Sequence, residues 1–219
     1  MARPAKVSPD RILAAAATEF AARGYAGARV DRIARRARVN KAMLYYHFGS
    51  KQQLYRTLLR STFAQAAERL RAVGGGSHSP ADMVDAAIAT IADLAREETH
   101  FPAIMLREVA EGGAHLDRET LGALAAVPAA FAGIVSRGVA SGAFRSVHPM
   151  AAYFSMLAPV VLYMAAAPIR RELADTGLLD LATLRPDDFV RHLQDSMRRA
   201  LARDVSSAPP QSRLKRPTS

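Results

Sequence analysis

Apolar side chains recur every three to four residues along most of this chain, which is the spacing of amphipathic helices. The first such stretch starts at Ser8-Pro9-Asp10, where Ser can cap a helix and Pro fits its first turn. Gly24 is expected to end it. The apolar positions between are Ile12, Leu13, Ala16, Ala17, Phe20 and Ala21. No period-two alternation persists anywhere, and no internal repeat is visible, so the pattern predicts an all-α fold.

Two short helices are predicted next. The first runs from Val30 to Ala37, with its apolar positions spaced i, i+3, i+4 and i+7. After a tight connection, Asn40 can cap a third helix, Lys41 to His47, which would turn Leu44 and Phe48 inward. Ser50 and Gln53 match a capping box that opens a long fourth helix, and Gly74-Gly75-Gly76 predicts its end.

The remaining chain reads as further helices separated by short breaks. We predict their starts at Ser79, near Pro102, at Asp117, at His148 and at Arg185. The domain organisation that follows is a flexible arm at 1–7, a three-helix domain at 8–51 with its reading motif at 29–48, a larger helical domain at 52–203, and a disordered tail at 204–219.

One apolar segment is long enough to span a bilayer. Residues Pro149 to Ile169 are 21 residues without a charge. Pro159 lies in the middle, Ala is frequent, and the flanks show no bias of basic residues that would orient a span. We therefore expect a buried helix at a subunit interface and no membrane partner.

Charge is concentrated at one end of the chain. The net charge is +10, of which residues 1–51 carry +8, whereas residues 52–203 are neutral. A basic surface attracts DNA phosphates and releases their counterions, although a merely solvated surface is the alternative. There is no cysteine, which excludes disulfides and thiolate chemistry and fits a cytoplasmic location.

Two short helices joined by a tight turn on a basic surface are the parts of a helix-turn-helix, whose second helix fits the major groove. The run from Ile33 to Leu54, IARRARVNKAMLYYHFGSKQQL, resembles the signature of the TetR/AcrR family of transcriptional regulators. Phe20 to Tyr25 resembles the end of that family's first helix. The resemblance covers about Val7 to Arg60 and implies an N-terminal DNA-binding domain followed by a helical domain for ligand binding and dimerisation.

The resemblance also implies roles for individual residues. Lys41, Ala42, Met43 and Tyr46 would face the major groove, while Arg29, Arg32, Tyr45, His47 and Lys51 would contact phosphates. The alternatives are that the two tyrosines are packing aromatics and that His47 only ends its helix.

Three positions depart from the family pattern. Ala28 replaces the usual capping Thr, and Met43 replaces Thr or Ser. Arg38 stands where Gly is typical, so the turn must tolerate a side chain at a position where a positive φ is expected. These departures bear on the sequence preference rather than on the mode of binding.

For the C-terminal domain the resemblance implies an effector pocket and a dimer interface. The pocket candidates are Phe63, Met83, Ile104, Met105, Phe131 and Tyr153; ordinary core packing is the alternative for each. The last two long helices would pair with those of a second subunit. Their candidate contacts are Phe154, Leu157, Val160, Val161, Met164, Phe189, Leu193, Met197 and Leu201.

These features predict a homodimeric repressor that releases a palindromic operator in double-stranded DNA when it binds a small hydrophobic effector. An enzyme is the second hypothesis, but the six histidines are scattered and no HExxH, nucleophile elbow or dinucleotide fingerprint occurs. We predict no metal and no cofactor. A helical protein-interaction module with a vestigial helix-turn-helix is the third.

Overall fold

The computed structural model describes residues 8–178 and 184–203, and these residues form helices and no strands. The all-α prediction is therefore confirmed. The predicted arm 1–7 and tail 204–219 lie outside the described residues. The helices are α1 (Pro9–Gly27), α2 (Val30–Arg36), α3 (Lys41–Phe48), α4 (Lys51–Gly74), α5 (Pro80–Glu97), α6 (Phe101–Ala110), α7 (Arg118–Ala140), α8 (Pro149–Ala165), α9 (Ala167–Asp175) and α10 (Pro186–Leu201).

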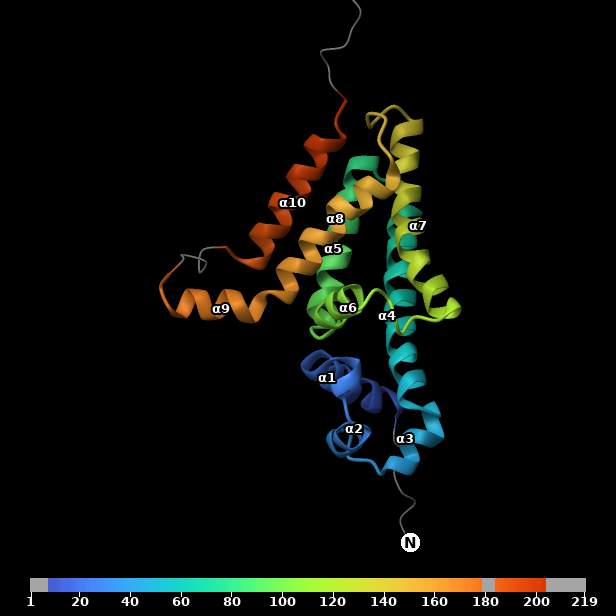
Figure 1. Cartoon of the computed structure of the whole chain (residues 1–219). Helices are drawn as coiled ribbons and strands as arrows, with labels where there is room; N and C mark the ends of the chain where they lie inside the picture. The colour runs from blue at the N-terminus through green and yellow to red at the C-terminus, as the bar shows by residue number, and fades with distance from the viewer. Residues whose placement is uncertain (1–7, 179–183, 204–219) are drawn as a thin grey trace, which may run out of the picture.

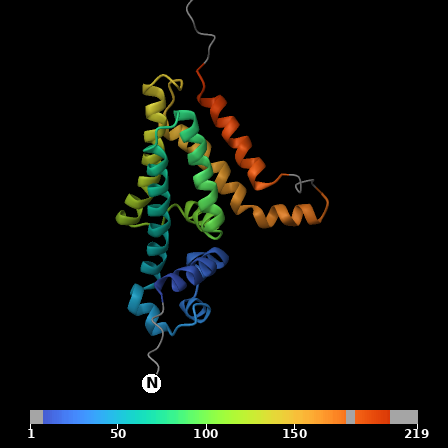
Figure 2. The same ribbon diagram turned by 180° about the vertical axis from the view of Figure 1, so that it is seen from behind.

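Helices α1 to α3 form one end of the molecule, and α4 runs from them along the length of the larger helical domain (Figure 1). Helix α7 lies beside α4, α5 packs against both, and α8 and α10 cover α5 from the other side. The view from behind shows α9 and α10 at the flank, away from α4 and α7 (Figure 2). Helix α1 joins the two ends, because it packs on both α4 and α6.

Most helix starts are fixed by the side chain that precedes them, as the sequence predicts. The side-chain oxygens of Ser8, Asn40, Ser50, Ser79 and Asp117 each accept a backbone N–H of the first turn. These bonds satisfy donors that have no partner within the helix. The boundaries are therefore encoded locally.

One predicted boundary is confirmed and one is wrong. The regular helical course of α1 ends at Gly24, which has φ 66° and ψ 176°, and a short further helical stretch continues beyond this kink to Gly27. The predicted uninterrupted helix from Pro149 to Ile169 is instead two helices bent by 53°, since α9 starts after Ala166 with Pro168 in its first turn. Helix α9 buries none of its residues in the subunit.

Four residues predicted for the dimer interface are buried within the subunit instead. Leu193, Met197 and Leu201 are buried in the subunit's own core, as is Val160 of α8. Next to this buried stripe, Arg198 pairs with two carboxylates of α5, Asp82 at 3.1 Å and Asp85. These four apolar side chains are therefore unavailable to a second subunit, because burying them already holds α10 on α5 and α8.

By length and composition alone, α7 could cross a membrane, and α8 with α9 would qualify only as a bent pair. Core helices of bundles meet the same criteria. Here Val127, Phe131, Ile134 and Val135 of α7 are buried in the helical core.

Candidate nucleic-acid interface

The turn between α2 and α3 is held in one shape by backbone and side-chain bonds. Arg38 has φ 52°, which confirms the positive φ expected at this turn position although the residue is not Gly. The guanidinium of Arg11 on α1 donates to the carbonyl of Ala37 at 3.0 Å, and the Asn40 side chain accepts the N–H of Met43 at 2.7 Å. Neither the sequence spacing nor the family signature points to the contribution of Arg11.

Helix α3 has one buried side and one open side. Leu44 is fully buried and Phe48 packs partly against the core, so these two residues anchor the helix. Tyr46 is 82% exposed and Tyr45 46% exposed, with Lys41 and Ala42 exposed on the preceding turn. Met43 is half-buried. The residues assigned to the groove thus share a solvent-facing surface on a helix anchored from behind.

Lys41 is engaged within the protein, because its ammonium forms an ion pair with Asp31 of α2. The sequence analysis did not foresee this pair. Both side chains are about half exposed, so the contact lies at the surface that would meet a nucleic acid.

Helix α2 starts without the side-chain cap that the family pattern would supply. Arg29 occupies the cap position and makes no side-chain capping bond. Its backbone N–H instead faces the buried carboxylate of Glu19 at 3.4 Å, and Arg32 lies 3.9 Å from the same carboxylate. Glu19 therefore partly replaces the missing cap and orients Arg32, which stays 42% exposed.

Two of the predicted phosphate contacts point elsewhere in this conformation. The Lys51 ammonium donates to the carbonyl of Ala26 at 3.3 Å and lies 4.6 Å from the centre of the Tyr25 ring. Desolvation lowers the pKa of Lys51. The Nε2 atom of His47 is buried without a hydrogen-bond partner in the described chain, so a phosphate contact through it requires the ring to turn.

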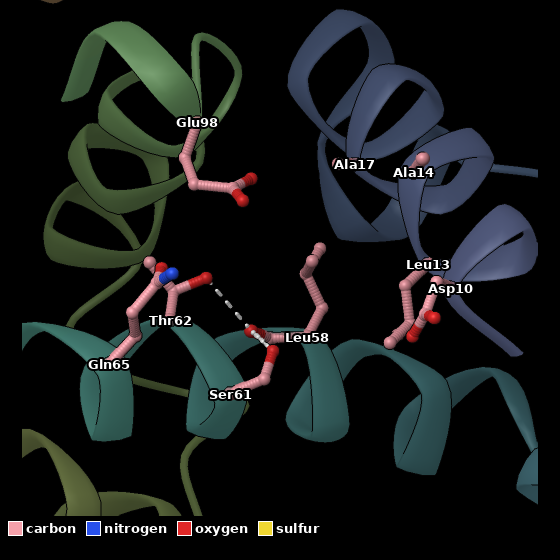
Figure 3. A pocket seen from close by; sticks show the side chains of 9 residues that line it. All are labelled: Asp10, Leu13, Ala14, Ala17, Leu58, Ser61, Thr62, Gln65 and Glu98. Atoms are coloured by element: carbon pink, nitrogen blue, oxygen red, sulfur yellow. Dashed lines mark hydrogen bonds between the residues drawn. The ribbon is translucent and has the colours of Figure 1, made fainter. Parts of the chain in front are cut away.

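None of the predicted effector-pocket residues lines either of the two clefts found in the described part of the chain. Phe63, Met83, Ile104, Phe131 and Tyr153 are buried in the core, and burial raises the pKa of Tyr153 to about 12. The two clefts described lie elsewhere. One, of about 480 Å³, lies between α1 and α4 near Glu98 (Figure 3). The other, of about 410 Å³, lies between α7 and the end of α4.

A rigid turn, a buried anchor and an exposed polar surface on the second helix define a helix-turn-helix of the kind that enters DNA grooves. The family comparison agrees with this class. Residues 12–58 match the model described as bacterial regulatory proteins of the tetR family, and residues 80–188 match that of the tetracyclin repressor-like C-terminal domain. The chain belongs to the TetR family of helix-turn-helix transcriptional regulators.

Individual relatives resemble the chain to different extents. The HTH-type transcriptional repressor NicS of Pseudomonas putida is 28% identical over 208 residues, with 92% of this chain and 96% of NicS covered. The HTH-type transcriptional repressor SCO4008 of Streptomyces coelicolor is 42% identical, but over only 30% of this chain and 34% of its own length.

Solved structures share the whole architecture. The TetR-family regulator PfmR of Thermus thermophilus superposes with a TM-score of 0.63 at 25% identity, covering 89% of this chain and all of PfmR. FadR of Bacillus subtilis, solved with stearoyl-CoA, gives a TM-score of 0.67 at 17% identity, covering 89% of this chain and 98% of FadR. The named family members in this comparison are transcriptional regulators rather than enzymes.

Proposed function

We propose that this chain is a cytoplasmic, homodimeric repressor that reads a palindromic operator with α3 and is released from it by a small-molecule effector. The observation that carries the proposal is the open side of α3. Tyr46 holds an aromatic ring 82% exposed on a helix whose Leu44 is fully buried. An exposed ring on an anchored helix, with Lys41 one turn earlier, supplies both an apolar contact for a base edge and a charge for a phosphate or guanine.

The basic residues around α3 support the same proposal. The exposed arginines are Arg29 at the cap position before α2, Arg32, Arg35 and Arg36 of α2, and Arg38 of the turn. Their guanidinium groups can pair with phosphates on either side of the groove that receives α3, which fixes the position of the protein but carries no sequence information. Base discrimination then falls to Lys41, Met43 and Tyr46.

The outer face of α8 supports dimerisation. Phe154 is 60% and Leu162 62% exposed, and Leu157, Val161 and Met164 are half-buried. No charged residue lies on α8. An exposed apolar face of this kind is typical of an interface between subunits. Two-fold pairing of the subunits matches an operator whose half-sites are inverted repeats.

Release by an effector rests on the family's architecture. FadR, which has the same fold, was solved with stearoyl-CoA. An effector that binds one arrangement of the helical domain better than another shifts the population toward it, and α1 transmits the shift because it packs on α4 and α6. We keep Phe63, Met83, Ile104, Met105, Phe131 and Tyr153 as pocket candidates, which requires the core to open on binding.

The test of DNA recognition starts by selecting bound sequences from a random pool, which is expected to return a palindrome. On that DNA, Tyr46→Ala and Lys41→Ala are each expected to weaken binding about tenfold or more, equivalent to about 1–3 kcal/mol per specific contact. Arg71→Ala is the matched control, since it removes an exposed positive charge at the far end of α4. Unchanged affinity in both variants, or an equal loss in the control, would refute the role of α3.

The dimer is tested by sedimentation. Phe154→Asp combined with Leu162→Asp is expected to give monomers, because two charges would be buried in the interface. Val109→Asp on α6, at a position 70% exposed, is the control for adding a surface charge. A doubly substituted chain that still sediments as a dimer would place the interface elsewhere.

A further inference from the structure

The end of α6 and the loop after it gather two carboxylates around one imidazole. Glu108 lies in the last turn of α6 and Glu111 caps its end, and His115 returns to them through Gly112 and Gly113, which have φ 67° and 76°. His115 Nδ1 lies 3.0 Å from a Glu108 oxygen and 3.4 Å from a Glu111 oxygen. All three ligand atoms lie within 4.8 Å of one another.

These separations fit a shared metal ion. Donor atoms bound to one Zn²⁺ through bonds of about 2.0–2.2 Å lie about 2.9–3.6 Å apart in octahedral to tetrahedral geometry. Both contacts of His115 Nδ1 fall in that range, and the two carboxylate oxygens lie within 4.8 Å of each other. One imidazole nitrogen and two carboxylate oxygens are also ligand types that zinc accepts.

The groups behind the cluster hold its members in place. Tyr55 of α4 donates its hydroxyl to Glu108 at 2.8 Å, and the other Glu108 oxygen accepts the backbone N–H of His115 at 3.0 Å. Arg56 donates to the carbonyl of His115 at 2.9 Å. Contacts that orient ligands in this way are typical of metal sites, where they fix the geometry before the ion arrives.

The local charge is a second, independent observation. Glu108 is only 1% exposed, yet no guanidinium or ammonium group of the described chain forms an ion pair with Glu108 or Glu111; His115 is the recorded partner of both. Tyr55 donates a hydrogen bond to Glu108 but supplies no positive charge. A buried carboxylate without a full cationic partner is costly, and a divalent ion would balance it.

We propose that Glu108, Glu111 and His115 bind a divalent metal ion of the zinc type. The ion takes the place of the hydrogen bond between His115 Nδ1 and Glu108, and the neutral imidazole binds it through Nδ1 with its single proton on Nε2. Glu111, whose side chain is 43% exposed, faces the solvent side of the site. Water completes the coordination there.

The position of the site gives it a route to the helix-turn-helix. The centres of the His115 ring and the Tyr25 ring, at the end of α1, lie 4.0 Å apart. The Lys51 ammonium lies over the same Tyr25 ring, 4.6 Å from its centre. An ion that holds His115 against the end of α6 would therefore also hold this end of α6 against Tyr25 of α1. This consequence, unlike the site itself, rests on the proposed function.

The experiment is a calorimetric titration of the chelator-treated full chain with ZnCl₂, together with the absorption spectrum of the Co²⁺ form. One ion per chain is expected. Glu111→Gln and His115→Gln should each weaken binding at least about tenfold, the effect typical of disturbing a built metal site. His192→Gln is the matched control, since His192 is exposed on α10.

Glu111→Gln keeps the proposal testable if His115→Gln fails to fold, because the Glu111 side chain pairs with no described residue other than His115. Unchanged zinc affinity in Glu111→Gln, or an equal loss in His192→Gln, would overturn the site, as would a wild-type chain that takes up no ion. The titration contains no DNA, so it stands whether or not the chain recognises an operator. Zinc-dependent operator affinity that disappears in Glu111→Gln would support the link to α1.

Discussion

Gly138 of α7 is the position at which adding one methyl group should do most harm. A Cβ atom there would lie 2.1 Å from Cδ2 and 2.3 Å from Cε2 of Phe144. Non-bonded carbons prefer separations of about 3.5–4.0 Å, so the ring would have to retreat by roughly 1.5 Å. It cannot retreat freely, because the Phe144 N–H donates to the Gly138 carbonyl at 2.9 Å and the Arg145 N–H donates to Leu201 at 3.0 Å.

Gly138→Ala is therefore expected to lower the free energy of unfolding. Overpacking costs about 1–3 kcal/mol, and the better helix propensity of Ala returns up to about 1 kcal/mol. Gly122, in the same helix, is the matched control, since a Cβ there meets nothing within 4 Å. Gly122→Ala should stabilise by about 0.5–1 kcal/mol, so the difference between the two variants isolates the clash.

The assay is urea unfolding followed by circular dichroism, at one protein concentration because the proposed dimer would contribute to stability. Combining Gly138→Ala with Phe144→Leu should recover part of the loss, and the double-mutant cycle measures the coupling. If Gly138→Ala proved as stable as Gly122→Ala, Phe144 would not be packed against α7 as described, and the reasoning would fail.

Three further predictions concern caps and titrating groups. Asp117→Ala should cost about 1 kcal/mol in urea unfolding, because Asp117 accepts the Thr120 N–H at 2.9 Å to cap α7. A hydrogen bond from the Thr120 hydroxyl is the main cause that lowers the pKa of Asp117, and one from Ser79 is the main cause that lowers the pKa of Asp82. The stability that these two carboxylates contribute should therefore be present above the ordinary carboxyl pKa and be lost as the pH falls through the lowered values. Acid unfolding of the wild type compared with Asp82→Asn measures this loss. Burial raises the pKa of Tyr153 to about 12, so its contribution should be lost as pH rises from about 10 toward that value, and Tyr153→Phe should flatten this alkaline limb of the unfolding curve.

The local features of the fold were predictable from the sequence because they depend on neighbouring residues. Ser8, Asn40 and Ser50 cap the helices that their positions predicted, and Leu44 is the buried anchor of α3. The break at Ala166 was missed because the segment is uniformly apolar, which left Pro168 as the only signal of a new helix.

Periodicity shows which side of a helix is buried but not what covers it. Leu193 and Met197 form the stripe expected of an interface, yet they pack inside the subunit. The same limit applies to Phe131 and Tyr153, whose apolar character fits a pocket and a packed core equally. Contacts such as that between Tyr25 and His115 join residues far apart in the sequence and leave no local pattern.

The ion pair between Lys41 and Asp31 changes what a salt titration of DNA binding would count. A lysine that meets a phosphate normally does so while the DNA sheds a condensed cation into solution, and this loss sets the steepness of the salt dependence. Lys41 already has the Asp31 carboxylate as its counterion within the protein. When Lys41 turns to a phosphate, the freed carboxylate lies next to the DNA and attracts a salt cation, which offsets the cation that the phosphate releases. The salt dependence should therefore count about one contact fewer than the phosphates touched. In electrostatic terms Asp31 occupies the place of a phosphate on the free protein, so a DNA strand must outcompete it before Lys41 can take part in recognition.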